Sequence, residues 1–159
     1  MSEIKIIKRE LPSKASAKIA IVVSRFNSFV VDRLYDGAIR TLRNNDINDE
    51  SITVIHVPGA FEIPLAVKTC LDQKRFDAII TLGAIIRGET PHFEYISSEC
   101  TRGIGQLGLE TGIPVIFGVL TVDDAEQAMD RAGADESNKG AEAALAALEM
   151  ISVLEQVRS

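Results

Sequence analysis

Several residue types are scarce in this sequence, and each scarcity excludes a class of protein. The 159 residues include no tryptophan and only two histidines and two cysteines, and 17 basic residues stand against 23 acidic ones, for a formal net charge of -6. A surface with this balance lacks the basic footprint that binding to nucleic acid or to an anionic membrane requires. A small anionic ligand would therefore need a local basic pocket.

The few cysteines and histidines argue against disulfide bonds and against a metal site. Cys70 and Cys100 have no Cys-x-x-Cys spacing and fall in helical patterns, so we expect two buried, unpaired thiols in a reducing compartment. His56 and His92 form no ligand pair at helical or loop spacing, so we expect no metal site. The N-terminus has no apolar core of signal-peptide length, and no later segment approaches transmembrane length without charges, which makes the cytoplasm the expected location.

Length and composition predict a single domain. A chain of this size with 46% hydrophobic residues can bury a sizeable core, and it contains no linker, repeat or low-complexity stretch. Pro12 separates the short apolar run Ile4–Ile7 from the rest. We therefore expect one domain over residues 1–159, with an N-terminal arm over 1–16 and an α/β core over 17–159.

Four apolar β-type runs alternate with helical patterns. The runs cover residues 19–23, 52–57, 77–83 and 115–120. The helical segments between and after them carry inward-facing residues at helical spacing: Val30, Leu34, Ala38 and Leu42; Ile63, Ala66, Val67 and Cys70; Phe93, Ile96, Cys100, Ile104 and Leu107; and, from Gly140 to about Val157, Ala144, Leu148, Ile151 and Leu154. Strands separated by helix-length crossovers imply a three-layer α/β/α sandwich around a four-stranded parallel sheet. Such a sheet leaves exposed edges, so we expect oligomerisation that covers an edge.

The fourth run is followed by a predicted short helix. Thr121 to Asp124 matches the helix-start pattern in which a threonine caps the helix, and Gly133 is the expected end.

The segment Arg87-Gly88-Glu89-Thr90-Pro91-His92-Phe93-Glu94 sets a histidine beside carboxylates directly after the third run. Thr90 can cap a new helix and Pro91 fits its first position, so His92 should lie in the first turn. The unsatisfied N–H groups there disfavour imidazolium, and we expect a neutral, proton-accepting His92. The alternative is that His92 merely hydrogen-bonds the helix start.

Ligands of open parallel sheets bind outside the carboxyl ends of the strands. Here those ends carry residues 25–27, 58–62, 83–90 and 117–118. Phe26 is a candidate plate on which a planar ring could stack, and Gly59 and Gly83 would let a ligand approach the backbone closely. On pattern alone, Phe26, Phe61 and Phe117 fit a core as well as a pocket.

Arg131 and Lys139 lie on either side of the turn 132–138 and form a candidate phosphate site close to helix N–H groups. The alternative is that Arg131 complements a helix dipole and that Lys139 is a solvated charge. His56, inside an apolar run, reads as a packed or subunit-contact residue.

Five blocks of the sequence are more specific than the hydrophobic pattern of strands and helices. They are residues 24–27, 57–64, 81–93, 114–121 and 131–133 with 138–140. In order and spacing they closely resemble the lumazine synthase family, from about Ala17 onward. The resemblance implies a flavodoxin-like fold and a transferase that condenses 5-amino-6-(D-ribitylamino)uracil with 3,4-dihydroxy-2-butanone 4-phosphate. The products would be 6,7-dimethyl-8-ribityllumazine, phosphate and water, in the penultimate step of riboflavin biosynthesis, without metal or redox cofactor.

The resemblance also implies roles for individual residues. Phe26 would stack on the uracil, Ala60, Phe61 and Glu62 would line the ribityl chain, the Ala84-Ile85-Ile86 backbone would read the ring edge, and Phe117 would reach in from a neighbouring subunit. Glu89, Thr90, Arg131 and Lys139 match the butanone phosphate pocket, and His92 matches the proton-transfer residue. The acidic pair Asp135-Glu136 departs from relatives that often carry a basic residue in this turn, which bears on phosphate binding and on assembly.

The expected assembly is a homopentamer in which the N-terminal strand of one subunit adds to a neighbour's sheet. Between Arg131 and Lys139 the chain has none of the extra residues of some pentamer-only relatives, which favours an icosahedral shell of pentamers. Association with riboflavin synthase is a further expectation, and nucleic acid and membrane partners are not expected.

Three competing functions can be compared with the sequence. A flavodoxin-like binding module needs a Ser/Thr/Gly-rich phosphate loop after the first strand, but residues 25–29 contain no glycine. A phospho-acceptor receiver needs an aspartate at the end of the third strand, where Leu82-Gly83 stands. A structural shell protein without activity stays open on sequence grounds.

Overall fold

The computed structural model describes residues 3–10, 16–134 and 137–159. Its centre is a four-stranded parallel sheet in the order β2-β1-β3-β4. The strands are β1 (Ile19–Ser24), β2 (Ile52–Val57), β3 (Ala78–Ile86) and β4 (Val115–Val122). The helices are α1 (Ser28–Asn44), α2 (Ile63–Asp72), α3 (His92–Thr111), α4 (Ala125–Asp130) and α5 (Lys139–Arg158), with short 3-10 turns at Asp49–Ser51 and Ala60–Glu62. The predicted α/β sandwich is confirmed.

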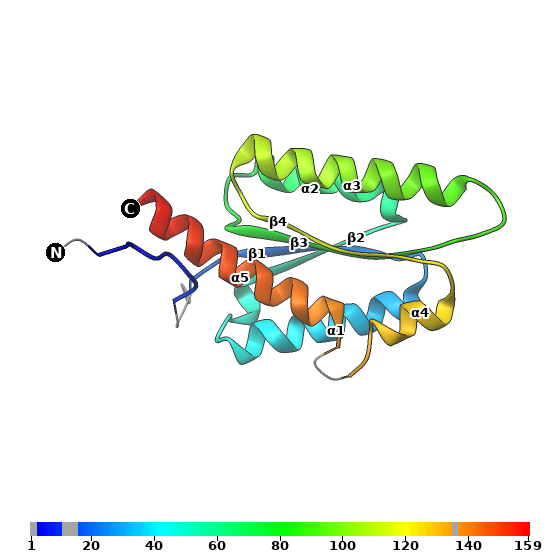
Figure 1. Cartoon of the computed structure of the whole chain (residues 1–159), viewed down its shortest axis with the longest axis horizontal. Helices are drawn as coiled ribbons and strands as arrows, with labels where there is room; N and C mark the ends of the chain where they lie inside the picture. The colour runs from blue at the N-terminus through cyan, green and yellow to red at the C-terminus, as the bar shows by residue number, and fades with distance from the viewer. Residues whose placement is uncertain (1–2, 11–15, 135–136) are drawn as a thin grey trace.

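Two helical layers cover the sheet, with α1, α4 and α5 on one face and α2 and α3 on the other (Figure 1). Successive side chains of a strand point to opposite faces, so a central strand feeds both layers. Ile19, Ile21 and Val23 of β1 pack in the core with α1 and α5, whereas Ala20 and Val22 pack in the core with α2 and α3. A strand covered on both faces must be apolar throughout, and for this reason β1 has no alternation.

The predicted inward-facing residues of the helices are largely confirmed. The α1 residues Val30, Leu34, Ala38 and Leu42 are fully buried, and in α3 Cys100 and Ile104 are buried while Phe93, Ile96 and Leu107 are partly buried against the same core. Both cysteines are free and buried, as expected. Burial raises the pKa of the Cys100 thiol to about 11 and also raises the pKa of Cys70, so both thiols stay protonated near neutral pH.

The predicted end of the third strand was wrong. Gly83 does not close β3, because the strand continues to Ile86 through pairing with β4, from Gly83 opposite Val119 to Ile86 opposite Val122. The glycine has a different function there. A Cβ at this position would lie 2.7 Å from Ser24 Oγ, so glycine allows β3 and β1 to approach.

Two predicted helix starts were also wrong in detail. Thr121 belongs to β4, and α4 is capped by Asp124, whose side chain accepts a hydrogen bond from the Gln127 N–H; the helix ends at Asp130, before Gly133. Pro91, not Thr90, occupies the cap position of α3, and Thr90 Oγ1 lies 3.5 Å from the His92 nitrogen. His92 nevertheless lies in the first turn of its helix, as predicted.

The N-terminal arm runs beside α5. Glu10 N–H donates to Ser152 Oγ at 3.0 Å, and Gln156 Nε2 donates to the Lys8 carbonyl at 2.6 Å. The apolar run Ile4–Ile7 forms no strand among the described residues of this chain, and Ile4 and Ile6 are 89% and 74% exposed.

Gly140 allows α5 to cross α1 at short distance. A Cβ there would lie 1.9 Å from the Leu34 carbonyl oxygen, which cannot move without shifting α1. We expect Gly140→Ala to lower the free energy of unfolding by about 1–3 kcal/mol. Gly105, in the exposed part of α3, has open space at the same atom, and Gly105→Ala should raise stability by about 0.5–1 kcal/mol. Chemical denaturation of both variants tests this, and a stable Gly140→Ala variant would contradict the close approach.

Candidate functional site

A cavity of about 560 Å³ opens at the carboxyl ends of β1, β2 and β3, and we call it the rim cavity. It is lined by Phe26, Asn27, Pro58, Gly59, Ala60, Phe61, Glu62, Ala84, Ile85, Ile86, Gly88, Thr90, His92, Phe93 and Ile96. The strand-end rule therefore located the cavity correctly, and it brings together most of the predicted site residues from four separate segments.

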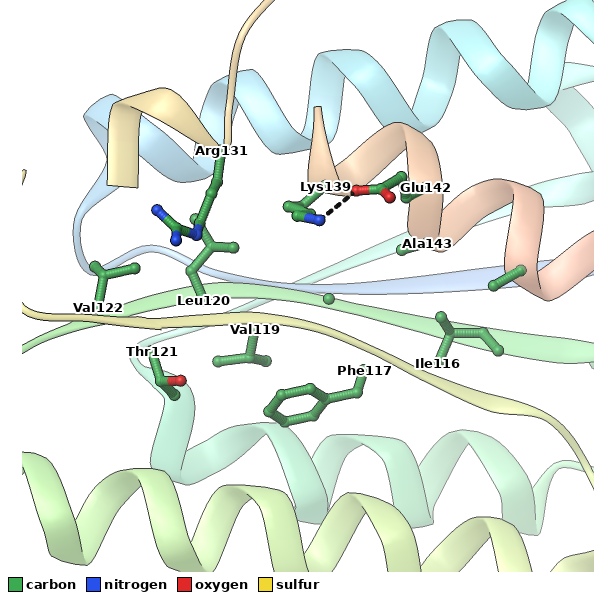
Figure 2. A pocket seen from close by; sticks show the side chains of 12 residues that line it. Ile116, Phe117, Val119, Leu120, Thr121, Val122, Arg131, Lys139, Glu142 and Ala143 are labelled. Carbon is green, nitrogen blue, oxygen red and sulfur yellow. Dashed lines mark ion pairs between the residues drawn. The ribbon is translucent and has the colours of Figure 1, made fainter. Parts of the chain in front are cut away.

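A second cavity of about 420 Å³ lies along β4, and we call it the edge cavity. Phe117, Arg131 and Lys139 line it together with Glu142 (Figure 2). No residue lines both cavities, so one chain splits the predicted site into two groups. Glu89 lines neither, and its side chain is exposed in the loop between β3 and α3.

The three predicted aromatic residues are not core residues. Phe26, Phe61 and Phe117 are 71%, 55% and 44% exposed, at strand ends or on the edge strand. Large apolar rings exposed beside a cavity indicate a binding surface. The core interpretation of these three residues is therefore wrong.

Asn27 fixes the orientation of the loop that carries Phe26. Its backbone is left-handed, with φ 63° and ψ 42°, a conformation that asparagine tolerates better than most residues. Its Nδ2 donates to the Ala84 carbonyl at 2.8 Å, and the Phe26 N–H donates to the Pro58 carbonyl at 3.1 Å. The sequence placed Asn27 at the end of the first strand but assigned it no role. Its side chain makes no cap hydrogen bond, and the contact with Ala84 depends on the fold.

His92 is exposed at the start of α3 and lines the rim cavity. The carboxylate expected beside it does not bind it, because Glu94 pairs with Arg87. No hydrogen bond of the imidazole is found among the described residues. The imidazole is therefore free to exchange a proton with a molecule in the cavity. His56, by contrast, is exposed on β2 and lines neither cavity.

Arg131 and Lys139 come together across their turn, as predicted. The Lys139 N–H donates to the Arg131 carbonyl at 2.8 Å, and both side chains reach the edge cavity (Figure 2). Lys139 Nζ pairs with Glu142 at 2.8 Å, whereas the Arg131 guanidinium donates only to the Gln127 carbonyl among the contacts described. Asp135-Glu136 lie outside the described residues.

Asn138 holds this turn against α1. It is 1% exposed, and its Nδ2 donates to the carbonyls of Arg33 and Gly133 at 3.0 and 2.8 Å while its Oδ1 accepts from the Ala141 N–H at 3.0 Å. The sequence predicts only one of these two roles of Asn138, the helix cap. An asparagine before a helical pattern predicts a cap, but the contact with α1 depends on the fold.

No helix in the described part of the chain is long and apolar enough to cross a membrane.

A comparison with known protein families gives a match over nearly the whole chain. The matching family model is described as 6,7-dimethyl-8-ribityllumazine synthase and covers residues 16–155. Every residue discussed for the rim cavity and the edge cavity lies inside the matched segment.

Proposed function

The chain belongs to the 6,7-dimethyl-8-ribityllumazine synthase family and is an enzyme of riboflavin biosynthesis, and on that premise we propose the reaction and the site that carries it out. The proposed substrates are 5-amino-6-(D-ribitylamino)uracil and 3,4-dihydroxy-2-butanone 4-phosphate. The observation that carries the proposal is the rim cavity, in which an exposed aromatic ring, the end of strand β3 and a histidine line one space. Its volume is in the range of small-molecule sites.

The rim cavity suits the pyrimidine substrate. Phe26 offers an exposed ring face for the uracil, and the end of β3 at Ala84, Ile85 and Ile86 offers backbone groups to its polar edge. The short 3-10 turn Ala60–Glu62 would line the ribityl chain, with the Glu62 carboxylate accepting hydrogen bonds from its hydroxyl groups.

The butanone phosphate would bind between two subunits. Arg131 and Lys139 supply positive charge, but they line the edge cavity and not the rim cavity. We propose that the β4 edge of one subunit completes the rim cavity of the next, bringing Phe117 over the uracil and the two cations toward Glu89 and Thr90. The exposure of Phe117 on an edge strand supports this arrangement.

The chemistry needs proton transfer and charge neutralisation. The 5-amino group of the pyrimidine attacks the ketone carbon and one water is lost to give an imine. Phosphate is then eliminated, and the ribityl-bearing nitrogen attacks the carbonyl that remains on the butanone chain, so that loss of a second water closes the lumazine ring. We propose that His92 transfers protons to and from these groups and that Arg131 and Lys139 neutralise the departing phosphate.

Purified protein mixed with both substrates tests the reaction. Lumazine absorbance should appear together with an equal amount of inorganic phosphate, and neither should appear when one substrate is omitted. An inert shell protein of the same fold would release neither product.

Assembly is the second part of the proposal. The exposed Ile4 and Ile6 fit the partly exposed β2 edge of a neighbour, so we propose that the arm 1–16 adds to that edge while 17–159 forms the core. The proposed assembly is a homopentamer, and we favour an icosahedral shell built from such pentamers. We also propose that it is located in the cytoplasm and associates with riboflavin synthase. Light scattering should report a pentamer or a multiple of it, and a monomer at micromolar concentration would contradict the shared site.

Phe26→Ala should weaken pyrimidine binding by about 1–3 kcal/mol, the range for losing one aromatic stacking partner of a base. Affinity for the butanone phosphate should stay nearly unchanged. Phe29→Ala is the matched control, because Phe29 is also half-exposed at the start of α1 but lines neither cavity. Calorimetric titration with each substrate distinguishes the two variants, and equal losses would indicate misfolding.

A further inference from the structure

Arg87 joins two loops that lie beside the two cavities. Its side chain follows β3, pairs with Glu94 in the first turn of α3, and donates through Nε to Asp123 Oδ1 at 3.0 Å. Asp123 directly follows β4, and its N–H donates to Gln127 of α4 at 2.8 Å. One guanidinium therefore connects the start of α3 with the junction between β4 and α4.

Two further contacts fix the geometry of this residue. The Arg87 N–H donates to the Val122 carbonyl at 2.9 Å, which extends the pairing of β3 with β4 by one bond. The guanidinium carbon lies 4.4 Å from the centroid of the Phe93 ring, close enough for a cation–π interaction, and Phe93 lines the rim cavity. The contacts with Asp123 and then Glu94 raise the pKa of Arg87, so it stays charged at any working pH.

The segment between Arg87 and α3 has little other support. Gly88, Glu89 and Thr90 are exposed and outside regular structure, and the Thr90 hydroxyl contact with the His92 nitrogen is long, at 3.5 Å. The pair from Arg87 to Glu94 closes this segment across seven positions. It therefore links the first turn of α3 to the residue that follows β3.

We propose that Arg87 is a positioning residue that holds the first turn of α3, and with it His92 and Thr90, over the rim cavity. The proposal rests on the proposed function, because it assigns importance to the placement of His92. A displacement of about 1 Å can cost as much as 100-fold in rate when a reactive group must meet its substrate in one geometry. Arg87 is half-exposed, so its ion pairs add little to overall stability.

Arg87→Gln tests this against a control variant at Arg102, an exposed arginine of α3. Arg102 also makes two side-chain contacts, with Glu99 at 2.5 Å and Gln106 at 2.7 Å, but it lines neither cavity. We expect Arg87→Gln to lower turnover about 10-fold with KM for the pyrimidine nearly unchanged, and Arg102→Gln to match the native enzyme. Arg87→Lys should recover little, because an ammonium cannot bridge both carboxylates and stack on the ring.

Hydrogen exchange gives a readout that does not depend on activity. The Glu94 and Tyr95 N–H groups donate to the Pro91 carbonyl and report on the first turn of α3. Their exchange should be about 10-fold faster in Arg87→Gln and unchanged in Arg102→Gln. Glu94→Gln should reproduce the effect, and the double variant Arg87→Gln with Glu94→Gln should lose no more than Arg87→Gln alone.

Native turnover and native exchange in Arg87→Gln would overturn the proposal, as would equal losses in Arg102→Gln. If the native protein forms no lumazine, the proposed function fails, and the exchange experiment still decides whether Arg87 holds the turn.

Discussion

Arg131→Ala is expected to weaken binding of the butanone phosphate by about 2–4 kcal/mol, the loss expected when one partner of a desolvated charge pair is removed. The guanidinium reaches the edge cavity without a carboxylate partner among the contacts described, so it is available to a phosphate. Lys139, already paired with Glu142, should compensate only in part. Calorimetric titration with the butanone phosphate measures the change directly.

The control for this variant is Arg43→Ala. Arg43 is also an exposed arginine, but it pairs with Asp49 at 2.9 Å and lines neither cavity, so its removal should leave both substrate affinities unchanged. Affinity for the pyrimidine should persist in Arg131→Ala. If Arg131→Ala and Arg43→Ala bound the butanone phosphate with the same affinity, Arg131 would only complement the end of its helix and would not bind the substrate.

His92→Ala is expected to lower turnover about 10²-fold, the lower end of the range for general acid–base assistance. Imine formation between an amine and a ketone proceeds slowly even in water, and the arrangement of two substrates in one site survives the substitution. Both substrates should therefore still bind. Single-turnover kinetics separate the chemical step from binding.

His56→Ala provides the comparison, because the only other histidine is exposed on β2 outside both cavities. We expect it to keep native turnover. Full turnover in His92→Ala would assign proton transfer to bound water or to the phosphate of the substrate itself.

The sheet and its helices could be predicted because their sequence signals are local. Runs such as Ile19–Val23 are apolar at every position, and the stripe from Val30 to Leu42 has helical spacing, so each element is specified by its own residues. The end of β3 is different. Gly83 resembles a strand terminator, but pairing with β4 carries the strand to Ile86, and no local signal reports that pairing.

The rim cavity could be predicted from a general rule, since parallel strands end at one side of a sheet. Phe26, Glu62 and His92 were found in this way. The separation of Arg131 from them could not be found, because it depends on where α4 and α5 cross β4. The two ion pairs of Arg87 could not be predicted either, because Glu94 and Asp123 come from different segments of the chain and only the folded structure brings them together.

A mixed assembly of His92→Ala and Arg131→Ala subunits tests most directly whether each site takes its histidine from one subunit and its arginine from the next. Neither variant alone has an intact site, but in a ring built from equal amounts of both, about a quarter of the interfaces would combine an intact His92 with an intact Arg131. Co-expressed and co-purified with two different tags, the mixture should recover about a quarter of native turnover at low butanone phosphate concentration. Turnover no higher than the average of the two separate variants would contradict a site shared between subunits.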